Sequence, residues 1–209
     1  MGTVLGWGPG AAVTHNMAVG DLAILDDVID QTHLRPRTFF EDSPLGFLRQ
    51  FPVFCQSLRR ACDEALHEMK LVYHGAATAA VREGPRLETP AEVRMLSAMG
   101  AEIVTHTFAP EMFLARELQI CYAAVCYIVN YAETGSRHSR FASGELFGGL
   151  SARSDSERLA GSVGAMGQIV AQISAAATGG HDGVCECHNA MADQAAEHSL
   201  DADWRTWFT

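Results

Sequence analysis

The stretch GAEIVTHTFAPEMFLARELQICYAAVCYIVNYAE, Gly100–Glu133, contains the pattern that decides the fold. Glu102–Thr107 and Cys121–Val129 are apolar runs of strand length, and Pro110–Leu118 between them begins with a proline suited to the first position of a helix. The second run is apolar almost throughout, which is typical of a strand covered by helices on both faces. This unit predicts an α/β fold.

The same alternation extends outward over most of the chain. Further strands are predicted at Leu22–Ile29 and Leu71–Val81, and further helices at Val53–Met69, Pro90–Met99 and Ser156–Ala177. Alternating strands and helices are typical of a largely parallel sheet. We expect one α/β domain over residues 1–178, followed by a surface tail with Cys and His residues over 179–209.

Composition limits the classes of function. The chain has 209 residues, of which 48% are hydrophobic and 19% charged, enough for one sizeable core. Its net charge of −10 argues against a nucleic-acid partner, which requires clustered Lys and Arg. The apolar run Ile120–Val129 is too short to span a bilayer, and no basic signal-peptide region begins the chain, so we expect no membrane partner and a cytoplasmic location. The scattered cysteines are expected to be reduced thiols.

A second informative stretch is EGPRLETPAEVRM, Glu83–Met95. Thr89 is placed to cap the following helix, Pro90 to be its first residue, and Glu92 to favour the positive end of the helix dipole. Glu88 is therefore not needed as a cap. It is either a solvated loop acid or a functional carboxylate.

Together with GDLAILDDVIDQTHLRPRTFF (Gly20–Phe40), these two stretches resemble, in order and spacing, the family of purine nucleoside phosphorylases and methylthioadenosine phosphorylases. The resemblance implies a mixed sheet wrapped by helices, usually assembled as a trimer. It also implies a reaction in which phosphate attacks the anomeric carbon of a purine nucleoside or 5′-methylthio nucleoside and releases the free base. Phosphate is then a co-substrate, and no cofactor is expected.

The resemblance assigns roles to two residues in base recognition. A catalyst of this reaction must stabilise the leaving purine with hydrogen bonds. Glu88 matches a Glu that holds the ring N1–H, and Asn130 matches an Asn that addresses the N7/O6 edge. This pair points to hypoxanthine or guanine rather than adenine. The alternative is that Asn130 is only a turn residue at the end of a strand.

Other positions match the family less evenly. Thr107 matches a phosphate ligand at the start of the Pro110 helix, and Leu87 falls where an aromatic residue often stacks on the base. Phe47 matches a residue that covers the sugar across a subunit interface, but it could equally be a core or interface residue. His106 replaces the usual Met under the ribose, where it could donate to a hydroxyl or mark a site that no longer binds a nucleoside.

Family members normally carry a strand, a glycine-rich phosphate loop and an Arg-His pair before the point at which this sequence starts. We therefore expect an N-terminally truncated member, in which Gly6–Gly10 replaces a turn and an uncovered sheet edge or apolar face drives assembly. Either a partner chain completes the site in a homo- or hetero-oligomer, or phosphate is not the nucleophile. The alternatives to phosphorolysis are a non-catalytic nucleoside-binding subunit and a nucleosidase that uses water.

A metal site is a further candidate near the C-terminus. His181, Cys185, Cys187 and His188 fall close together, and thiolate and imidazole are ligands that zinc and softer metals prefer. The C-x-C-H spacing is not a standard zinc pattern, so the alternative is a flexible tail that happens to be rich in cysteine.

Overall fold

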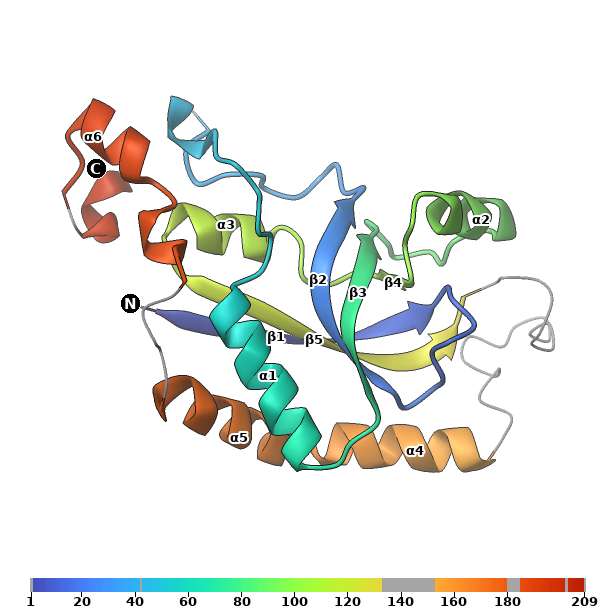
Figure 1. Ribbon diagram of the computed structural model, residues 1–209. Coiled ribbons are helices and arrows are strands. Elements are labelled where there is room, and N and C mark those ends of the chain that lie inside the picture. The colour runs from blue at the N-terminus through green and yellow to red at the C-terminus, as the bar shows by residue number, and fades with distance from the viewer. Residues whose placement is uncertain (1, 42, 133–152, 180–184, 202, 209) are drawn as a thin grey trace.

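The computed structural model of the protein describes residues 2–41, 43–132, 153–179, 185–201 and 203–208. Its strands form a closed barrel in the order β1-β4-β3-β2-β5 (Figure 1). They are β1 (Thr3–Ala12), β2 (Leu22–Asp30), β3 (Tyr73–Val81), β4 (Ile103–Thr105) and β5 (Cys121–Tyr131). The sequence predicted the last four, and β1 is an additional strand.

Parallel and antiparallel pairs are combined around the barrel. β1 runs parallel to β5, and β3 runs parallel to both β2 and β4, whereas the β1–β4 and β2–β5 pairs are antiparallel. The expected mixed, largely parallel sheet is therefore confirmed. The expected free sheet edge is wrong for the described strands, because β1 pairs with β5 on one side and with β4 on the other and so closes the ring.

The glycine-rich stretch Gly6–Gly10 is part of strand β1, which corrects the prediction of a turn. Its alternate glycines leave room for side chains of other strands and loops. A Cβ atom on Gly8 would lie 2.5 Å from Thr107 Oγ1, and one on Gly10 would lie 2.5 Å from Ile103 Cγ2. These glycines are thus explained by close packing in the barrel rather than by a phosphate loop.

The described helices lie around the barrel (Figure 1). They are α1 (Gln56–Glu68), α2 (Pro90–Ala98), α3 (Glu111–Glu117), α4 (Arg153–Gly164), α5 (Met166–Gly179) and α6 (Ala192–His198), with 3-10 turns η1 (Pro44–Gly46), η2 (Cys187–Asn189) and η3 (Trp204–Phe208). Within the described residues, no single helix is long and apolar enough to cross a membrane; α4 and α5 meet that length and composition only when taken together across their bend.

Two predicted helices differ from those observed. The single helix expected over Ser156–Ala177 is two helices, bent by 44°, and the glycines Gly161, Gly164 and Gly167 around the break disfavour a continuous helix. Helix α3 begins at Glu111, one residue after the predicted proline, and has only 7 residues. Its first turn carries the Glu111 carboxylate, whose negative charge disfavours binding of a phosphate anion at that end of the helix.

Strand β5 separates two layers of the core. Tyr122, Ala124, Cys126 and Ile128 belong to the core cluster shared with Phe108 and Met112 of the α3 region. The intervening residues Cys121, Ala123 and Val125 pack instead with residues of α1 and α5. This strict alternation along a strand explains why the whole run is apolar.

The C-terminal segment packs onto the domain, and the predicted surface tail is wrong for its described part. Met191 and Trp207 are buried together with Phe40 and Leu45, which precede and form part of η1. Cys185 is also buried, within the core cluster of α1 and α5. Burial of these side chains holds the described part of this segment against the chain around η1 and against the core cluster of α1 and α5.

Candidate functional site

The loop before α2 presents the carboxylate of Glu88. Thr89 and Glu92 form the predicted capping box of α2, with Pro90 as its first residue, so the loop ends in a fixed geometry. Glu88 is left outside this cap, and its side chain is only 6% exposed. Its Oε1 lies 3.6 Å from Arg82 Nε and 3.5 Å from His106 Nε2.

Arg82 holds this region together through several contacts. It donates to Gln31 Oε1 at 2.5 Å and to Glu92 Oε1 at 2.8 Å, in addition to its ion pair with Glu88. Arg86 also donates to Glu92, and this lowers the pKa of the Glu92 carboxyl below its usual range. The carboxylate of Glu88 is thus held between a guanidinium and an imidazole.

Asn130 is a buried polar residue near the end of β5. A register shift between Ile128 and Asn130 pairs Asn130 with Ala11 of β1, a residue that packs against the buried cluster of α2 and β4. The Asn130 Oδ1 is buried and has no hydrogen-bond partner within the described residues. An unpaired buried amide oxygen costs free energy unless a ligand or water pairs with it, so Asn130 is a candidate ligand-binding residue.

Packing brings the Glu88 loop and the end of β5 into the same region. Val93 and Leu96 of α2 form a buried cluster with Val104 of β4, and Ala132, two residues after Asn130, packs against this cluster. Figure 1 likewise shows α2 and the C-terminal end of β5 on the same side of the barrel. The structure therefore places both predicted base-recognition residues around one end of the barrel.

Two hydroxyl groups lie together after strand β4. Thr105 Oγ1 donates to the carbonyl of Pro9 at 2.7 Å and lies 2.8 Å from Thr107 Oγ1. The backbone N–H of Thr107 also donates to Thr105 Oγ1 at 3.2 Å. Because the Thr105 hydroxyl proton is used by Pro9, the Thr107 hydroxyl donates to Thr105, so an oxyanion would have to displace an existing bond of Thr107.

Arg35 is a structural residue that the sequence analysis did not single out. Its guanidinium donates to the carbonyls of His106 at 2.9 Å, Ala109 at 2.5 Å and Arg82 at 3.1 Å. It thereby connects the ends of β3 and β4 and positions the loop that carries His106 and Thr107. No local pattern reveals this role, because all its partners are distant in the sequence.

The remaining predicted binding residues are exposed. Leu87 is half exposed beside Glu88, where an apolar contact with a ligand is feasible. Phe47 is 91% exposed and follows η1. Its carbonyl accepts from Gln194 of α6, at the other end of the molecule from α2 (Figure 1). Within one chain Phe47 is therefore remote from Glu88, and its predicted role across a subunit interface stays a prediction.

A cavity of about 870 Å³ lies beside Phe47, at the end of the molecule opposite α2. Its lining includes Phe51, Arg116, Cys187 and Gln194 but neither Glu88 nor Asn130. This cavity is therefore separate from the region of the predicted base-recognition residues.

The predicted metal ligands are only partly brought together. His181 lies outside the described residues. Cys185 and Cys187 lie with Cys55 and Cys121, and His188 is exposed and not part of that group. Among the described residues the ligand set proposed from the C-x-C-H spacing is therefore corrected, because the fold supplies two thiols from distant segments and His188 is not part of the group.

Hydrogen bonds among these thiols shift their acidities in opposite directions. The pKa of Cys55 is lowered, because the thiols of Cys121 and Cys187 donate to its sulfur. The pKa of Cys121 is raised, because ionisation would break its bonds to the sulfurs of Cys187 and Cys55. The cluster therefore favours a thiolate at Cys55, the residue that precedes helix α1.

Comparison with known proteins identifies related sequences and folds. The family model described as "Phosphorylase superfamily" matches residues 1–157. The 6-oxopurine nucleoside phosphorylase of Pyrococcus furiosus is 41% identical over 123 residues, covering 56% of this chain and 46% of that protein. A probable S-methyl-5′-thioinosine phosphorylase of Methanopyrus kandleri is 41% identical over 113 residues, covering 54% and 44%. The chain thus spans about half the length of the curated relatives it matches.

A solved structure supports the same fold at low sequence identity. Methylthioadenosine phosphorylase from Schistosoma mansoni, solved in complex with adenine, superposes with a TM-score of 0.75. The alignment covers 93% of this chain and 70% of that one, at 20% identity. At this identity the match establishes a shared fold alone.

Proposed function

Since the chain belongs to the phosphorylase superfamily, we propose that it binds a purine nucleoside, with a 6-oxopurine base, and cleaves it by phosphorolysis. The C1′–N9 bond breaks as a phosphate oxygen bonds to C1′, and the products are the free base, protonated on a ring nitrogen, and a sugar 1-phosphate. The observation that carries this proposal is the buried Oδ1 of Asn130, which has no hydrogen-bond partner in the part of the chain that the structure describes.

In this proposal Asn130 acts on the departing base. As the C1′–N9 bond breaks, negative charge develops on the purine and a proton is taken up at N7. The Asn130 Oδ1 accepts a hydrogen bond from N7–H, and its amide N–H donates to O6. Because these bonds strengthen as the charge develops, they lower the barrier rather than only tightening binding.

Glu88 determines the choice of base in the same proposal. A 6-oxopurine carries N1–H, which can donate to the Glu88 carboxylate, whereas adenine has an unprotonated N1 that would face a carboxylate. A site built to pair with N1–H disfavours the analogue that leaves the carboxylate unpaired. Curated relatives named as 6-oxopurine nucleoside and methylthioinosine phosphorylases support this choice.

Phosphate binding requires more than the described residues near Thr107 offer. One hydroxyl is a weak anion site, and the Glu111 carboxylate at the start of α3 opposes an anion there. In our proposal a partner chain supplies further phosphate ligands within a homo- or hetero-oligomer, and Phe47 of a neighbouring chain covers the sugar. The same proposal places the enzyme in the cytoplasm.

A second candidate function is a non-catalytic subunit that binds purine or nucleoside. It is favoured by the contact between His106 Nε2 and Glu88 Oε1 at 3.5 Å, since a protonated His106 would compete with the base for this carboxylate. A subunit of this kind would bind hypoxanthine without any turnover. A nucleosidase that uses water is the remaining alternative.

Base release from inosine, guanosine, adenosine and their 5′-methylthio analogues tests the proposal. The protein is assayed with and without phosphate, alone and with fractions of its native source that contain candidate partners. We expect phosphate-dependent release from 6-oxopurine nucleosides that falls about 100- to 1000-fold in Asn130→Ala. The control Asn16→Ala removes an exposed Asn and should retain full activity.

The other outcomes are equally specific. Release that does not depend on phosphate would assign a nucleosidase. Binding without release under any condition would assign the non-catalytic subunit, and a fully active Asn130→Ala variant would contradict the role of that residue.

A further inference from the structure

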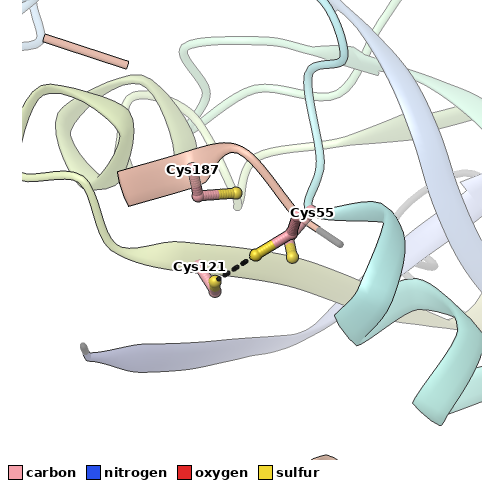
Figure 2. Close-up of side chains that lie close together, drawn as sticks. Cys55, Cys121 and Cys187 are labelled. Atoms are coloured by element: carbon pink, nitrogen blue, oxygen red, sulfur yellow. Dashed lines mark hydrogen bonds between the residues drawn. The ribbon is translucent and has the colours of Figure 1, made fainter. Parts of the chain in front are cut away.

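Four cysteine sulfurs converge at a point where three distant segments of the chain meet. Cys55 ends the loop before α1, Cys121 is the first residue of β5, and Cys185 and Cys187 lie at the start of the C-terminal segment. Figure 2 shows the sulfur atoms of Cys55, Cys121 and Cys187 directed toward one another. Neither base recognition nor phosphate binding uses these residues.

The spacing of the sulfurs suits a single small metal ion. All four sulfur atoms lie within 4.8 Å of one another, and those of Cys121 and Cys185 are 3.5 Å apart. Tetrahedral zinc with Zn–S bonds of about 2.3 Å requires S···S separations of about 3.8 Å. The cluster is therefore close to the required geometry, and modest movements of the thiols would complete it.

The surroundings are suited to the negative charge that four thiolates carry around a divalent ion. Cys55 lies at the N-terminus of α1, a helix of 13 residues, where the helix dipole favours a thiolate. Arg116 lies near Cys187, and its guanidinium also donates to the carbonyls of Phe51 and Pro52 in the loop that leads to Cys55. Its Nε is buried and, among the described residues, has no hydrogen-bond partner.

We propose that Cys55, Cys121, Cys185 and Cys187 bind one zinc ion as a structural tetrathiolate site. Zinc replaces the protons of the thiols that are not already ionised, and no electron transfer is involved. Four protein ligands leave no open position for water or substrate, so the ion has no direct role in catalysis. By coordination to all four sulfurs, the zinc ion links the segment that begins at Cys185 to β5 and to the loop before α1.

This site would influence the surface around Phe47. The segment that the zinc fastens continues into α6, where Gln194 donates to the carbonyl of Phe47 at 2.9 Å. Loss of the metal is therefore expected to loosen α6 and the cavity beside Phe47. The region of Glu88 and Asn130, at the other end of the molecule, should be unaffected.

A disulfide is the competing use of the same thiols. Cys121 and Cys185 have their sulfurs 3.5 Å apart, longer than an S–S bond of about 2.05 Å but close enough to form one with an external oxidant. A disulfide would remove both sulfurs as thiolate ligands. Metal content and thiol content measured on the same sample distinguish the two states.

The first experiment measures metal in the full chain purified under reducing conditions. We expect one zinc per chain by elemental analysis, and Co²⁺ substitution should give the visible absorption of a tetrahedral tetrathiolate complex. A chelator should lower Tm by about 5–10 °C relative to protein with zinc 100-fold above Kd. Zinc affinity should fall as the pH is lowered, because protons compete for the thiolates.

The second experiment uses a matched pair of variants. Cys187→Ala removes a half-buried ligand and should lose at least tenfold in zinc affinity together with the tetrathiolate spectrum. Cys62→Ala removes a buried thiol of α1 outside the cluster and should bind zinc as the parent does. If Cys187→Ala does not fold, the metal content and cobalt spectrum of the unaltered chain still decide the question.

Three results would overturn the proposal. One is a fully reduced chain that takes up neither zinc nor cobalt stoichiometrically. Another is a Cys187→Ala variant with an unchanged cobalt spectrum. The third is a Cys121–Cys185 disulfide, found by mass spectrometry, that persists in reductant and excludes the metal.

Discussion

Replacing Glu88 with alanine tests base recognition most directly. The side chain is 6% exposed and lies between Arg82 and His106, and its carboxylate is the group proposed to accept from purine N1–H. A hydrogen bond to a charged, largely buried group contributes about 1–3 kcal/mol. Glu88→Ala should therefore weaken 6-oxopurine binding about 5- to 150-fold.

Titration calorimetry with hypoxanthine, guanine and adenine measures this effect. The unaltered protein should bind the two 6-oxopurines more tightly than adenine, and Glu88→Ala should lose most of that preference. Arg82 keeps its 2.8 Å bond to Glu92 in the variant, so the loop should remain folded, which thermal unfolding checks. Glu64→Ala, at an exposed position of α1, is the matched control and should leave all affinities unchanged.

Two results would refute the reasoning. Adenine binding as tight as hypoxanthine binding in the unaltered protein would show that the carboxylate does not select for N1–H. Unchanged hypoxanthine affinity in Glu88→Ala would show that the base does not contact this side chain at all.

Three further variants test the packing and electrostatics around the site. Gly8→Ala should lower the free energy of unfolding by about 1–3 kcal/mol in urea titrations, because the new Cβ would lie 2.5 Å from Thr107 Oγ1. The control Gly161→Ala adds a Cβ in open space on α4 and should not lower the stability of the protein. His106→Met should raise hypoxanthine affinity by up to about fivefold in calorimetry by freeing Glu88, and a loss of affinity would instead assign His106 to ligand binding. The backbone N–H groups of His33 and Leu34 lower the pKa of the Glu83 carboxyl. The stability that this carboxylate contributes is therefore present above the ordinary carboxyl pKa and is lost as the pH falls through the lowered value. Glu83→Gln should reduce the loss of stability between neutral and acidic pH, and an unchanged loss would contradict the role of this carboxylate.

Local patterns in the sequence determined most of the secondary structure. The capping residues Thr89 and Pro90 fixed the start of α2, and Gly100, with φ of +95°, ends it as expected for a glycine after a helix. The apolar run of β5 identified a strand buried on both faces. These features depend on residues within a few positions of each other, which is why the sequence alone reveals them.

Strand β1 is the clearest case that local patterns could not decide. Its glycines have low strand propensity and indicate a turn when considered alone. They form a strand because Thr107, Ile103 and Cys126 occupy the space that their missing side chains leave. That space exists only after the barrel closes between β5 and β4.

Resemblance to a family predicted roles for Glu88 and Asn130 from the sequence, but only the tertiary structure decided how the other groups combine. Arg35 reaches carbonyls 47 to 74 residues away, and Cys55 meets Cys185 across the interface between α1 and the C-terminal segment. The periodicity of apolar residues shows which face of an element is buried, but not which other element buries it. Because side-chain hydrogen bonds and a thiol cluster require atoms within a few ångströms, the packing of distant segments alone determines them.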